Sequence, residues 1–116
     1  MTPQEAAGYI RATFPIFRAH PEQWTTGTEY IRAAGISMFC VMGGGFALHG
    51  AKCGGYKVHP GFCTYYPDYP KRQEMADALG GNHGDLVQRI VRANNHAANV
   101  EDMIKRVEAV LKEAGL

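Results

Sequence analysis

The feature that most constrains the fold of this 116-residue chain is the amphipathic pattern between Asn99 and Gly115. Apolar residues recur in it every three or four positions, which places them on one face of a helix. These residues are Val100, Met103, Ile104, Val107, Val110 and Leu111. Asn99 is a typical N-cap and Gly115 a typical helix stop. A helix with this stripe must bury it, so the pattern predicts a packed, mainly helical domain.

A second helical pattern opens the chain. Residues 2–5, Thr-Pro-Gln-Glu, have the composition of a capping box with proline at the first helical position. The apolar positions that follow are Ala6, Ile10, Phe14 and Phe17. Pro15 predicts a bend or break near Thr13, because proline lacks the amide hydrogen that a helix interior uses. His20-Pro21 is expected to end the helix.

The other elements are placed by glycine, proline and apolar spacing. We expect a short strand or small hairpin within residues 28–35, a helix over 37–51, and helices over 70–79 and 85–95. Gly80-Gly81 separates the last two. The prediction is one compact domain over 1–116, mainly α with a small β-hairpin (α+β minor) and about five helices. Its core is expected to come from the first, second and last helices.

Composition limits the classes of partner. The formal net charge is +1, and the twelve lysines and arginines are scattered along the sequence. A nucleic-acid-binding protein usually shows a denser basic stripe, so we expect nucleic acid to be an unlikely partner. No apolar run has the length of a membrane span or signal peptide, which predicts a cytoplasmic protein without membrane contact.

Cys40 is a candidate nucleophile. It lies in the first turn of the predicted 37–51 helix, where the helix dipole favours a thiolate, and Gly43-Gly44-Gly45 follows it. This arrangement would suit a cysteine-dependent hydrolase or transferase, with a histidine as base. The alternative, which we favour, is a buried cysteine that packs as a small apolar residue. The protein is therefore expected not to be an enzyme.

Four other residues have the chemistry of a metal site. His49 and Cys53 are four positions apart, and His59 and Cys63 repeat that spacing. Two histidines and two cysteines can bind zinc tetrahedrally and would make the chain a zinc-stapled interaction module. Because close Cys-x2-Cys pairs are absent, we expect no cofactor and keep zinc as the alternative.

Residues 54–70 combine glycines and prolines with many aromatic rings, and loops of this length usually carry function. The predicted ligand- or partner-binding residues here are Tyr56, His59, Phe62, Tyr65 and Tyr66. Asn94-Asn95-His96, at the end of the 85–95 helix, adds polar edges; the alternative is that these side chains cap helix ends. Rings and amides together suit a planar ligand such as a nucleotide, or the loop of a partner protein. A homodimer through the aromatic loop is a further alternative.

Several short motifs resemble a family of small uncharacterised domains from actinobacteria and their phages. They are Trp24-x-x-Gly27, Phe39-Cys40-x-x-Gly43, Ala76-x-x-Leu79, and Ile90 with Asn94-Asn95. Where the family has Trp-Asn-Asp, this chain has Ala93-Asn94-Asn95 and so lacks a carboxylate. The resemblance implies a helical fold and a phage or prophage accessory protein, for example in counter-defence. It assigns no activity.

Overall fold

The computed structural model describes residues 1–21, 24, 26, 41, 72–81 and 83–116. These residues form helices α1 (Pro3–Ala19), α4 (Arg72–Ala78), α5 (Asp85–Asn95) and α6 (Val100–Glu113). The mainly helical class is confirmed, and the described residues contain no strand. The hairpin expected within 28–35 lies outside the described residues, and so does the helix expected over 37–51 except for Val41, so the count of about five helices stays a prediction.

Helix α1 begins as its sequence predicts. The Thr2 hydroxyl accepts a hydrogen bond from the Glu5 backbone N–H at 3.1 Å, and the Glu5 carboxylate accepts one from the Thr2 N–H at 3.0 Å. These bonds form a reciprocal capping box, which satisfies two donors that the helix itself leaves unpaired. The pKa of Glu5 is lowered because its carboxylate accepts hydrogen bonds from Thr2.

Of the bend or break expected near Thr13, the break is wrong, because α1 continues through Pro15 to Ala19, and the bend stays a prediction. Phe14 and Phe17 are buried in the core on either side of Pro15, while Pro15 itself is exposed. The packing of these two rings offsets the cost of an interior proline, about 3 kcal/mol. The helix then closes as expected at His20, whose backbone N–H donates to the Ile16 carbonyl at 2.8 Å.

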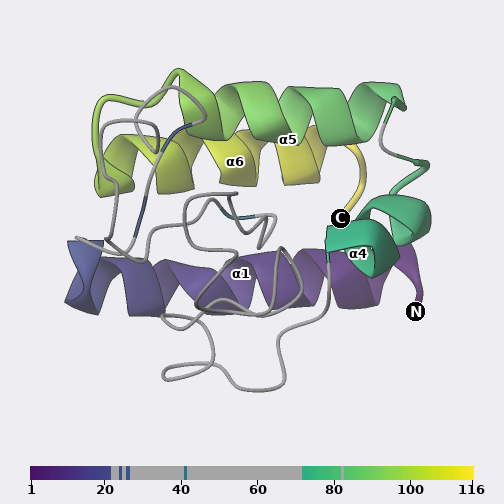
Figure 1. Ribbon diagram of the computed structural model, residues 1–116, viewed down its shortest axis with the longest axis horizontal. Coiled ribbons are helices and arrows are strands. Elements are labelled where there is room, and N and C mark those ends of the chain that lie inside the picture. The colour runs from purple at the N-terminus through teal and green to yellow at the C-terminus, as the bar shows by residue number, and fades with distance from the viewer. Residues whose placement is uncertain (22–23, 25, 27–40, 42–71, 82) are drawn as a thin grey trace, which may run out of the picture.

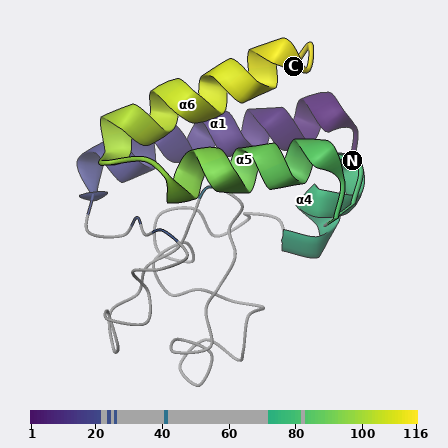
Figure 2. The same ribbon diagram turned by 90° about the horizontal axis from the view of Figure 1, so that it is seen from above.

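Helices α5 and α6 form an antiparallel pair, and α1 lies along α6 (Figures 1 and 2). Asn99 caps α6, as predicted, by accepting a hydrogen bond from the Asp102 N–H at 2.9 Å. Four residues separate α5 from α6 along the chain. This short connection holds the end of α5 close to the beginning of α6.

The turn between α4 and α5 depends on glycine. Gly80 and Gly81 have φ angles of 101° and 97°, a region that side chains other than glycine rarely adopt. The Gly81 N–H donates to the Ala76 carbonyl at 2.7 Å and so closes the end of α4. A Cβ atom at Gly84 would lie 2.7 Å from the Gly80 carbonyl oxygen, which explains the glycine before α5.

The described helices share one apolar core. The first and last helices contribute to it as predicted, and the second predicted helix, except for Val41, lies outside the described residues. Helices α4 and α5 also contribute to the core, which the sequence did not predict. Core residues with no exposed surface are Ala6, Ala7, Ile10, Phe17, Val41, Met75, Ala76, Val87, Ile90, Met103, Val107 and Leu111. Among the described helices none has both the length and the apolar composition needed to span a membrane.

Candidate functional site

Three of the eight predicted binding residues, Asn94, Asn95 and His96, belong to the described part of the chain. The other five predicted binding residues, Tyr56, His59, Phe62, Tyr65 and Tyr66, lie outside it. The alternative nucleophile Cys40 and the alternative zinc ligands His49, Cys53, His59 and Cys63 also lie outside it. The site described below is therefore the part contributed by the end of α5 and its neighbours.

Asn94 makes its contacts inside the protein. Its side chain is completely buried, and its Oδ1 accepts hydrogen bonds from the Trp24 indole N–H at 2.8 Å and the Val41 backbone N–H at 3.4 Å. Its Nδ2 donates to Asn95 Oδ1 at 3.1 Å. The amide thus links α5 to two segments that are distant in sequence. Neither a ligand contact nor a helix cap describes this role, which the sequence interpretation missed.

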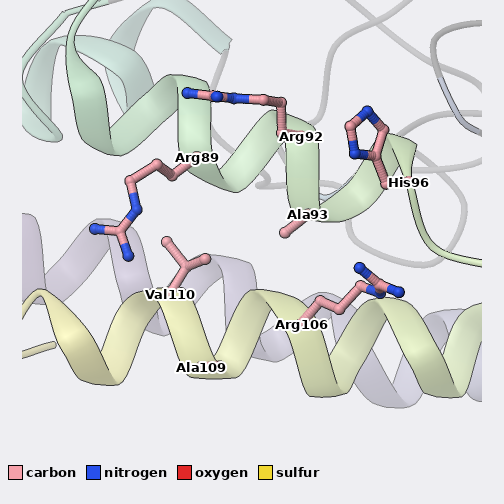
Figure 3. Close-up of a pocket in the computed structure, with 7 residues that line it drawn as sticks. All are labelled: Arg89, Arg92, Ala93, His96, Arg106, Ala109 and Val110. Carbon is pink, nitrogen blue, oxygen red and sulfur yellow. The ribbon is translucent and has the colours of Figure 1, made fainter.

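The opposite face of α5 borders a groove with α6. The groove has a volume of about 380 Å³ and is lined by Arg89, Arg92, Ala93 and His96 from α5 and by Arg106, Ala109 and Val110 from α6. Ala93 and Val110 point toward each other between the helices, and Arg89 and Arg106 occupy opposite ends (Figure 3). Arg92 extends along α5, away from α6 (Figure 3). The groove is therefore apolar at its floor and cationic around its edges.

Two of these arginines are paired with carboxylates. Arg89 forms an ion pair with Glu113 and lies 3.9 Å from Asp85. Arg106 Nε donates to Asp102 Oδ2 at 2.9 Å. The Ala98 backbone N–H donates to the same carboxylate, and this bond, together with Arg106, lowers the pKa of Asp102.

Arg92 differs from the other two. Its Nε donates to the Gln88 carbonyl of the same helix at 3.4 Å, and no carboxylate of the described residues pairs with it. His96 is exposed at the end of α5, whereas the Arg92 side chain extends toward the beginning of that helix (Figure 3). Guanidinium and imidazole N–H groups at the edge of an apolar groove can bind the oxygen atoms of an anion, above all phosphate.

The sequence contained a signal for this groove. Arg89, Arg92 and His96 are separated by three and four positions, so they must share one face of a helix. The contiguous polar run 94–96 drew attention to Asn94 instead, although Asn94 and Arg92 point to different sides of α5. Arg106 could not be assigned to the site from sequence, because the pairing of α5 with α6 brings it there.

Among the described residues, no group of three or more histidine, cysteine, aspartate or glutamate side chains could hold a metal ion. Comparison of the chain with protein-family models, with curated proteins and with solved structures gave no match. The function of this chain is therefore inferred from the geometry of the groove.

Proposed function

We propose that this chain is a small, non-enzymatic binding protein whose α5–α6 groove takes a phosphate-bearing, nucleotide-like ligand. The observation that carries the proposal is Arg92, a cation at the edge of a groove, without a carboxylate partner in the described part of the chain. Charge-assisted hydrogen bonds to phosphate are stronger than bonds between neutral groups, so an arginine in this position favours an anion.

The apolar floor supports the same class of ligand. Ala93 and Val110 offer a surface on which a planar base can lie, and Arg92 and His96 are the polar residues of the same lining that would bind its phosphates. The predicted aromatic residues of segment 54–70 would add stacking surfaces to such a site. The sequence motifs support an accessory protein of phage or prophage type, and we place it in the cytoplasm because no apolar run of the sequence has the length of a signal peptide or membrane span.

Isothermal titration calorimetry with ADP tests this function. We expect the wild-type protein to bind ADP and R92E to weaken binding at least tenfold, which corresponds to about 1.4 kcal/mol. The milder variant R92Q should weaken binding by about threefold to fivefold, because it removes the charge and keeps a polar side chain.

A matched control separates local from overall charge. G8E lowers the net charge by one, as R92Q does, at an exposed α1 position where a new Cβ meets no atom within 4 Å. G8E should bind ADP with wild-type affinity. Equal affinities of R92Q and G8E for ADP, or no binding of ADP by the wild type, would contradict the proposal.

A further inference from the structure

A second groove lies on the other side of α6, along α1. It has a volume of about 420 Å³ and is lined by Arg18, Glu101, Ile104, Lys105, Glu108, Ala109 and Lys112. Ala109 lines this groove as well as the α5–α6 groove, so it separates the two. Its methyl group is exposed and projects little. A flexible ligand chain could therefore cross α6 at this point in close contact with the helix.

The acidic residues of the second groove are already paired. Glu108 accepts two hydrogen bonds from Arg11 Nε, at 2.9 and 3.1 Å, and Glu101 accepts bonds from Arg18 at 2.7 and 3.1 Å. The bonds from Arg18 lower the pKa of Glu101. These four residues link α1 to α6 and largely cancel one another's charge.

Lys105 and Lys112 are the cations that remain. Both are exposed, and neither forms an ion pair with any described residue. They are seven residues apart on α6, about 10 Å along its axis at 1.5 Å per residue. Because Ala109 also lines the α5–α6 groove with its arginines, basic residues line the grooves on both sides of Ala109.

We propose that the ligand of this surface is the phosphodiester backbone of a nucleic-acid strand, which crosses α6 at Ala109 and contacts Lys105 and Lys112 as well as the α5–α6 groove. The proposal rests on the proposed function and extends it from one nucleotide to a chain of phosphates. The basic residues are scattered along the sequence, which made nucleic acid an unlikely partner. The packing of the helices nevertheless brings several of them to the two grooves. Contacts to phosphates alone should be independent of base sequence.

Fluorescence anisotropy with labelled twelve-residue strands of thymidine or deoxyadenosine tests the inference. The wild-type protein should bind both strands with similar affinity, and more tightly than it binds ADP. With three cations engaged, the logarithm of the association constant should fall against the logarithm of salt concentration with a slope of about −2.

Two substitutions at Ala109 test the crossing point. A109E introduces a carboxylate between the grooves and should weaken binding of the strand at least tenfold. A109Q has nearly the same size without the charge and should change binding less than threefold. Both residues are good helix formers at an exposed position, and circular dichroism should confirm that both variants fold.

The double variant K105Q/K112Q separates this inference from the proposed function. We expect it to weaken binding of the strand fivefold or more and to leave ADP binding within twofold of the wild type. If both ligands bind the double variant as they bind the wild type, the extended surface is refuted while the nucleotide groove stands. If R92E leaves ADP binding unchanged as well, the proposed function also fails.

Discussion

Asn94 shows how one buried polar side chain can connect parts of a helical protein that are far apart in sequence. Its Oδ1 accepts hydrogen bonds from two donors, the Trp24 indole and the Val41 backbone, and so satisfies both inside the core. A buried donor without an acceptor costs about 1–3 kcal/mol, so this amide stabilises the segments around it as well as its own helix. The Trp24 indole hydrogen bond thus connects its segment of the chain to α5.

We predict that N94L destabilises the protein by about 3 kcal/mol. Leucine is similar in volume but accepts no hydrogen bond, so it removes the acceptor that the Trp24 indole and the Val41 N–H share. The measurement is urea unfolding followed by circular dichroism, and W24F completes a double-mutant cycle. A coupling energy of about 1 kcal/mol between Trp24 and Asn94 is expected. Strictly additive effects would contradict the direct link.

At the scale of the element, the ends of the helices follow from sequence better than their interiors do. The Thr2 capping box, the Asn99 cap and the two glycines after α4 were all predicted, because each depends on local hydrogen bonds or backbone angles. The continuity of α1 through Pro15 was not predicted. It depends on the burial of Phe14 and Phe17, and burial is decided by the rest of the fold.

The first turn of α6 provides a test based on pH. Asp102 accepts hydrogen bonds from the Ala98 N–H and from Arg106, and these lower its pKa below the usual 3.8. A carboxylate with a lowered pKa stabilises the folded state above its unfolded pKa, and the contribution disappears as the pH falls through the folded pKa.

We therefore expect D102N to unfold at a lower temperature than the wild type at pH 7. The difference should shrink steadily below about pH 4, as the wild-type carboxylate becomes protonated. Thermal unfolding at a series of pH values measures it. E74Q is a control, because Glu74 is an exposed carboxylate on α4 without an ion pair among the described residues. A difference between D102N and wild type that stays constant down to pH 2 would contradict this account.

At the scale of the whole molecule, the arrangement of helices determines where the charges meet. Arg92 and Arg106 are fourteen positions apart in sequence, yet they line one groove because α5 and α6 are antiparallel. Helical class and the α5 and α6 boundaries could be predicted from apolar spacing together with the residues that cap or stop each helix. The groove could not, because spacing within one helix contains no information about which neighbour it faces. The predicted residues of segment 54–70 remain predictions.

The most direct test of the central claim is an amide chemical-shift titration of ¹⁵N-labelled protein with ADP. The α5–α6 groove predicts the largest shift changes at Arg92, His96 and Ala109. The amides of residues 3–9, in the N-terminal half of α1, should change little. Saturable changes concentrated at the groove would support the account, whereas changes elsewhere that leave these three amides unmoved would contradict it.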